Sequence, residues 1–172
     1  MISMGRTEAS LAQGGMHLLT TIHVVLSLIG IASGFLVIFQ MIGGKTLGGL
    51  NAVFLATTIL TSVTGFFFPI MKLTPGLVIG AISLVVLAIS LFALYSKQLS
   101  GGWRTAYVVT AVLAQFFNVL VLIAQSFQKI PALHAHAPAD DAPIVKICQL
   151  AALVLCIVLG IFAARNFKTA AA

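Results

Sequence analysis

The sequence predicts an all-α integral membrane protein, a single bundle of five transmembrane helices. Its 172 residues are 60% hydrophobic and 7% charged, with a mean hydropathy of +1.17, whereas a soluble globular chain is about 45–50% apolar and about 25% charged. A helix rises about 1.5 Å per residue, so about 20 apolar residues cross a hydrocarbon core about 30 Å thick. The apolar runs have this length, at about residues 18–41, 50–70, 75–95, 103–127 and 144–164.

Glycine, proline and lysine mark the breaks between these runs. Glycine and proline interrupt helices for backbone reasons, and here they coincide with charge. The breaks contain Gly43, Gly44 and Lys45, then Pro69, Lys72 and Pro75, then Lys97, Gly101 and Gly102, and finally Pro131, Pro138 and Pro143. Most connections are short, which favours antiparallel neighbours. We therefore expect one membrane-embedded domain over residues 1–172, with residues 1–15 as a flexible polar tail.

Five crossings would place the two termini on opposite sides of the membrane. The amino-terminal side then carries Arg6, Lys72, Lys129 and Lys146, and the carboxyl-terminal side carries Lys45, Lys97, Arg104, Arg165 and Lys168. Because Lys and Arg are enriched in cytoplasmic loops, this balance weakly favours a cytoplasmic C-terminus and an external N-terminus. The basic residues are scattered rather than clustered, which excludes nucleic acid as a partner.

Small and hydroxyl side chains predict where helices touch. Transmembrane helices associate through close van der Waals contact and interhelical hydrogen bonds, so small residues four apart mark contact faces. Such pairs are Gly30 and Gly34, Gly76 and Gly80, and Gly160 and Ala164. The second run adds the hydroxyls of Thr57, Thr58, Thr61, Ser62 and Thr64. We expect these hydroxyls to bond to their own helix or to a neighbouring one.

No Asp, Glu, Lys or Arg lies inside a run away from its ends. Proton relays, ion pathways and voltage sensors generally need such a group, so the pattern argues against a pump or an ion-coupled transporter. Cys148 and Cys156 share the last run at a spacing that excludes a disulfide within one helix, and we interpret them as small apolar residues.

Four histidines are the main candidates for chemistry, and five crossings would gather them at one membrane face. His17 and His23 project to different sides of the first helix, since six residues turn it by about 240° beyond a full turn. His23 with His134 of the last loop is a candidate pair of axial ligands for haem b. That only one of the helices carries a histidine counts against haem.

A zinc or copper ion is the alternative to haem at this site. His17 or His23, together with His136 or His134, supplies nitrogen ligands, and Asp140 or Asp141 supplies oxygen to complete the shell. Two further interpretations remain open: ordinary amphipathic residues at the membrane interface, which we favour, and a sensor of protonation.

The fourth run carries a polar stripe of Gln115, Asn118 and Gln125. A carboxamide in hydrocarbon is costly unless it is hydrogen-bonded, so the stripe should face protein or a wet cavity. Bonding to the threonines of the second run is favoured over a pocket for a quinone or a lipid headgroup. Aromatic residues near the run ends are expected to be interfacial anchors: Tyr95, Trp103, Tyr107 and Phe66, Phe67 and Phe68.

Two stretches carry a family resemblance. Residues 16–69 (MHLLTTIHVVLSLIGIASGF…TTILTSVTGFFFP) and residues 127–133 (FQKIPAL), the latter followed by APADDAP and the last run, resemble small proteobacterial multi-pass inner-membrane proteins of uncharacterised function. The resemblance implies a bacterial inner-membrane location and transfers no catalytic residue.

Three functions are compatible with the sequence. The favoured one is a non-enzymatic structural or accessory subunit in the lipid bilayer, as a homo-oligomer or within a larger membrane complex. The second is a haem- or metal-binding redox component. The third is a passive pore or small-molecule carrier built around the polar stripe.

Overall fold

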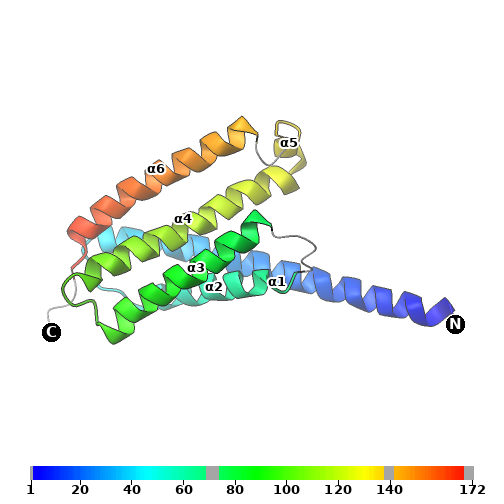
Figure 1. The fold of residues 1–172 in the computed structure, drawn as a ribbon, viewed down its shortest axis with the longest axis horizontal. Coiled ribbons are helices and arrows are strands. Elements are labelled where there is room, and N and C mark those ends of the chain that lie inside the picture. The colour runs from blue at the N-terminus through cyan, green and yellow to red at the C-terminus, as the bar shows by residue number, and fades with distance from the viewer. Residues whose placement is uncertain (1, 69–73, 138–141, 169–172) are drawn as a thin grey trace.

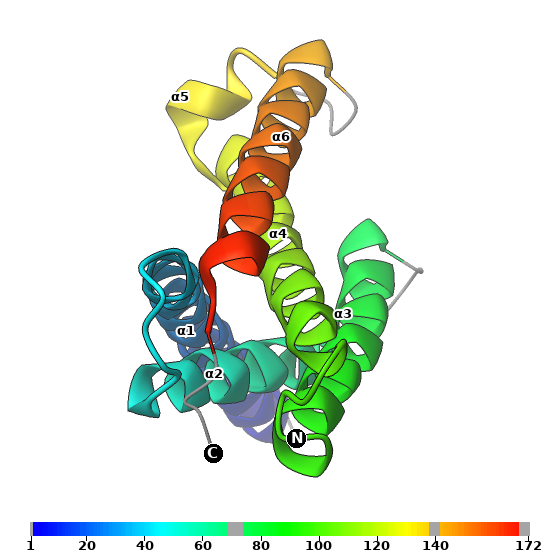
Figure 2. The same cartoon turned by 90° about the vertical axis from the view of Figure 1, so that its left-hand side faces the viewer.

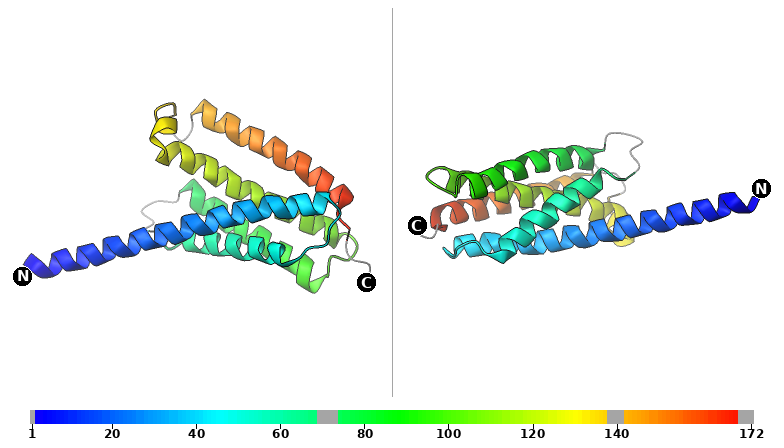
Figure 3. Two further views of the ribbon diagram at one scale, coloured as in Figure 1. Left: turned by 180° about the vertical axis from the view of Figure 1, so that it is seen from behind. Right: turned by 90° about the horizontal axis from the view of Figure 1, so that it is seen from below.

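A computed structural model describes residues 2–68, 74–137 and 142–168, apart from the side chains of residues 2–10 and 12. Each element within these ranges is helical: α1 (Ile2–Ile42), α2 (Gly49–Gly65), α3 (Pro75–Leu91), a π-helical turn η1 (Phe92–Ser96), α4 (Trp103–Lys129), the short α5 (Pro131–His134) and α6 (Pro143–Asn166). Successive long helices run antiparallel (Figure 1). The α1–α2 connection, the turn after η1 and the end of α6 gather at one end of the bundle, hereafter the C-terminal end, opposite the N-terminus (Figures 1 and 3).

The structure supports membrane-spanning character for four helices in the described part of the chain. The candidate spans are Gln13–Ile42, Pro75–Ser96, Trp103–Lys129 and Pro143–Asn166. The predicted count of five is not reached, because α2 is apolar but has only 17 residues. At about 1.5 Å per residue it is about 26 Å long, short of a hydrocarbon core of about 30 Å.

Two element boundaries differ from the prediction. The first helix begins at Ile2, so the segment expected as a flexible tail continues α1. Residues 8–13 (EASLAQ) explain the difference, since most of them are good helix formers. The last connection also contains the unpredicted helix α5, which begins at Pro131, a residue whose fixed φ suits the first turn of a helix.

The buried core centres on α4, which packs against α1, α3 and α6. Viewed along the bundle, α3 lies on one side of α4, and α1 lies on the other (Figure 2). Helix α6 behaves differently, since it buries Val145, Cys156 and Ala163 but exposes most of its large side chains. These are Ile144, Ile147, Leu150, Val154, Leu155, Ile157, Val158, Ile161 and Phe162. Such a surface suits hydrocarbon as the solvent.

The glycine pair of α1 packs tightly against the neighbouring helices α2 and α4. A Cβ added to Gly30 would lie 3.2 Å from both Thr57 Oγ1 and Thr58 Oγ1 on α2. A Cβ on Gly34 would lie 2.0 Å from Gln115 Oε1 and 2.8 Å from Phe54 Cε2. Gly30 is therefore tightly packed, a side chain at Gly34 would force its neighbours to shift, and the prediction of a contact face is confirmed here.

The other two small-residue pairs differ in how closely a neighbouring helix approaches them. A Cβ on Gly160 would lie 3.3 Å from Val112 Cγ1, so the α6 pair does face α4. The prediction for α3 is wrong at Gly76, where an added Cβ would meet nothing within 4 Å. Gly80 is looser too, with Phe66 Cε2 at 3.9 Å. Spacing alone therefore marks a face without showing that another helix covers it.

We expect Gly34→Ala to lower the free energy of unfolding by about 1–3 kcal/mol, the usual cost of overpacking a tight contact. The new methyl group would displace the Gln115 carboxamide. Thermal unfolding in detergent, followed by circular dichroism, measures the change. The control is Gly15→Ala on the same helix, where an added Cβ meets nothing within 4 Å and should be neutral or mildly stabilising. Equal melting temperatures for the two variants would contradict this contact.

Candidate functional site

His23 is engaged in the packing of α1 against α2. Its Nδ1 lies 2.9 Å from Thr64 Oγ1, and its ring meets Phe68 edge-on, with centroids 5.2 Å apart. The Thr64 hydroxyl donates its own proton to Thr61 O at 3.1 Å. We therefore assign the His23 proton to Nδ1, which donates to Thr64.

The other histidines lie on exposed surface. His17 is exposed on α1, and His134 and His136 are exposed at α5, which packs against α4. His136 Nδ1 donates to Ala132 O at 2.8 Å. Within the described ranges, no three His, Cys, Asp or Glu residues gather in a way that could hold a metal ion. Asp140 and Asp141, expected to complete such a shell, lie outside the described residues.

The polar stripe of α4 divides into two bonded residues and one exposed residue. Gln115 is fully buried, and its Nε2 donates to Ile31 O of α1 at 3.0 Å. Asn118 Nδ2 donates to Thr58 Oγ1 of α2 at 3.2 Å, so bonding to the second-run threonines is confirmed for this residue. Gln125 is exposed, and it does not continue the buried stripe.

Gln115 Oε1 lies against α1 at Gly34. It is buried without a hydrogen-bond donor among the described residues and faces Gly34. A glycine Cα–H is a weak donor to such an oxygen, and only glycine leaves this space open. Gln115 thus donates to the backbone of α1 at Ile31 and places its Oε1 against Gly34, three residues further along.

Two further polar pairs tie α4 to its neighbours. Tyr107 donates to Asn51 Oδ1 of α2, and both side chains are buried. Its prediction as an interfacial anchor is therefore wrong, because the ring points into the bundle where Asn51 accepts the hydroxyl proton. Ser90 of α3 donates to Thr110 Oγ1 at 2.7 Å. Sequence inspection missed both pairs, although an Asn near the start of an apolar run was a usable signal.

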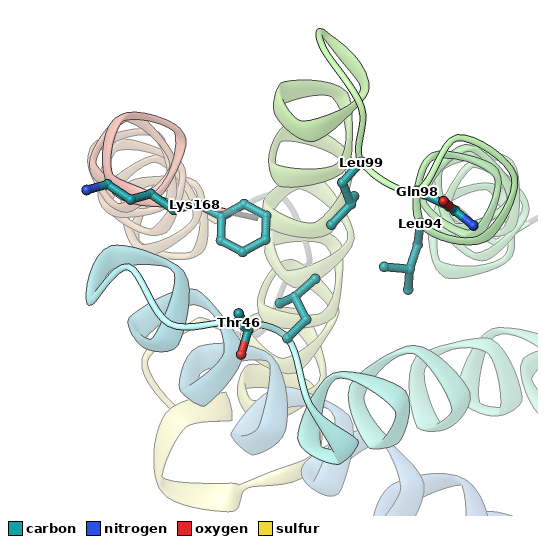
Figure 4. Close-up of a pocket in the computed structure, with 7 residues that line it drawn as sticks. Thr46, Leu94, Gln98, Leu99 and Lys168 are labelled. Carbon is teal, nitrogen blue, oxygen red and sulfur yellow. The ribbon is translucent and has the colours of Figure 1, made fainter. Parts of the chain in front are cut away.

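The C-terminal end of the bundle holds a cavity of about 290 Å³. It is lined by Thr46, Leu47, Leu94, Gln98, Leu99, Phe167 and Lys168 (Figure 4). Beside it, Arg104 Nη1 donates to Phe167 O at 2.8 Å. The guanidinium thus satisfies a carbonyl that follows the last turn of α6, where cations are favourable.

No known family model matches the chain, and no curated protein or solved structure is significantly similar to it.

Removing the Tyr107 hydroxyl tests the buried pair. We expect Tyr107→Phe to lower the free energy of unfolding by about 1–3 kcal/mol, because Asn51 Oδ1 would remain buried without a donor. Tyr95→Phe is the matched control, since Tyr95 is exposed. Denaturant titration in mixed micelles compares the two. A Tyr107→Phe variant as stable as the control would show that the hydroxyl contributes little.

Proposed function

We propose that this chain is a non-enzymatic structural or accessory subunit of a bacterial inner membrane. The proposal is supported by the hydrogen bonds that the buried and half-buried polar side chains of α4 form. Gln115, Asn118 and Tyr107 each bond to a neighbouring helix. Groups committed to interhelical bonds hold a bundle together and are not free to act on a substrate.

We further propose that α2 is the fifth crossing. The end of α1 and the start of α3 lie at opposite ends of the bundle, and α2 connects them (Figure 1). Helix α2 also packs against both α1 and α3. If those two helices cross the membrane in the same direction, the chain must return between them. A hydrophobic length a few ångströms short is accommodated by local thinning of the bilayer at modest cost.

With α2 as the fifth crossing, the two termini would lie on opposite sides, and we propose that the N-terminus is outside and the C-terminus in the cytoplasm. The basic residues at the C-terminal end of the bundle favour the cytoplasm for that end.

Cysteine accessibility tests the crossing by α2. In a background with Cys148→Ser and Cys156→Ala, we expect Gly48→Cys to react with a membrane-impermeant maleimide only from the cytoplasmic side. Phe67→Cys should react only from the outside, since both positions are exposed and flank α2. Spheroplasts and inverted vesicles supply the two sides. Labelling of both positions from one side would contradict the fifth crossing.

The mass of the solubilised assembly tests the structural role. We expect native mass spectrometry in mild detergent to show either a multiple of the 18.0 kDa chain or a stoichiometric membrane partner. A strictly monomeric protein without a partner would contradict the proposal. The same preparation should lack a Soret band and stoichiometric zinc or copper. Either signal would replace this proposal by the haem or metal alternative through His23 and the exposed histidines.

A further inference from the structure

The C-terminal end of the bundle concentrates positive charge without acidic residues. Its segments carry Lys45, Lys97, Arg104, Arg165 and Lys168, whereas the chain's three acids, Glu8, Asp140 and Asp141, belong to other segments. Arg104 is committed to Phe167 O. Lys97 lies over two rings, 5.5 Å from the Phe92 centroid and 5.8 Å from the Trp103 centroid. The other three cations form no ion pair with a described residue, so an external anion would be favoured here.

The cavity at this end combines apolar walls with a polar edge. Its wall residues Leu47, Leu94, Leu99 and Phe167 are half-buried or buried, and Thr46, Gln98 and Lys168 are exposed. Figure 4 shows Leu94 and Leu99 turned toward the space, whereas the Lys168 side chain extends away from it. A site of about 290 Å³ is at the lower limit of small-molecule pockets, about 300–1,000 Å³. This size fits part of a ligand whose remainder extends into the surroundings.

The turn that forms one wall is strained. Gln98 and Leu99 both have positive φ, 47° and 57°, directly after the π-helical turn η1. A leucine in this region is unusual, because its Cβ approaches the following carbonyl oxygen. The turn is fixed by a bond from Leu99 N to Ala93 O at 3.0 Å. Strain of this kind and π-helical turns both cluster at ligand sites.

We propose that this cavity binds an anionic phospholipid. The exposed Lys168 side chain would turn toward the lipid phosphate, with Lys45 adjacent in sequence to the lining residue Thr46, and the upper part of one acyl chain would lie against Leu94, Leu99 and Phe167. Apolar walls beside uncompensated lysines at the end of membrane helices match both parts of such a lipid. The inference rests on the proposed membrane embedding of this end.

The chain contains one tryptophan, Trp103, which begins α4 at the same end. Its fluorescence therefore reports lipids near this end. We would reconstitute the full chain in phosphatidylcholine vesicles containing equal fractions of either brominated phosphatidylglycerol or brominated phosphatidylcholine. Bromine quenches tryptophan at short range. The expected result is stronger quenching by the anionic lipid, from a severalfold higher relative binding constant.

Three variants separate the cavity from general surface charge. Lys168→Gln should remove most of the preference, because it removes the cation that lines the cavity. Thr46→Phe should abolish it by filling the cavity without changing charge. Arg165→Gln removes a cation at the same end that does not line the cavity, and it should leave the preference nearly unchanged. Circular dichroism confirms that each variant retains its helical content.

Four results would overturn the proposal. Equal quenching by the two lipids in the parent protein would reject the site and keep the membrane embedding. Quenching by neither lipid would reject the embedding of this end itself. An Arg165→Gln effect as large as that of Lys168→Gln would assign the preference to surface potential. Displacement by inorganic phosphate at constant ionic strength would make a soluble phosphate the ligand.

Discussion

The structure depends on how α4 satisfies its carboxamides where no water is available. A buried carboxamide without partners costs several kcal/mol in hydrocarbon. Gln115 meets half of this need, because its Nε2 donates to the backbone carbonyl of Ile31 on α1, whereas its Oε1 has no hydrogen-bond donor among the described residues. That approach exists only because Gly34 has no side chain. The contact between α4 and α1 therefore depends on both the polar residue of one helix and the glycine of the other.

Interhelical hydrogen bonds of this kind also fix the register of the neighbouring helices. Hydrophobic attraction does not select one helix pairing in lipid, because lipid tails are as apolar as the side chains. Directional bonds do select one. Asn118 and Tyr107 bond to α2 through Thr58 and Asn51, and Thr110 receives a proton from Ser90 of α3. Helix α6 has no such bond among those described along its buried face, and it packs through Gly160 against Val112. Its wide exposed surface follows from this simpler attachment.

Sequence inspection predicted these features unequally, for physical reasons. The helical class, the Gly30 and Gly34 face and the Asn118 bond followed from hydropathy and spacing. The end of α2 at Gly65 did not follow, because hydropathy records the preference of side chains for lipid and not where the α-helical backbone ends. The position of Tyr107 was missed because its partner lies 56 residues away. The positive φ of Leu99 had no local signal, since leucine is not a turn residue.

The C-terminal end of the bundle combines a concentration of basic residues with a strained turn, and the turn indicates that this end does more than carry charge. A cluster of lysines needs only an exposed loop, which any run of polar residues provides. The turn after η1 does more, since it holds Gln98 and Leu99 in a costly conformation. This conformation brings the Leu99 side chain to the cavity wall. Strain persists only where surrounding contacts enforce it, and here the bond to Ala93 O and the packing of Leu99 against the buried core do so. An apolar wall built at such a cost beside unpaired cations suits a ligand that is itself both apolar and anionic.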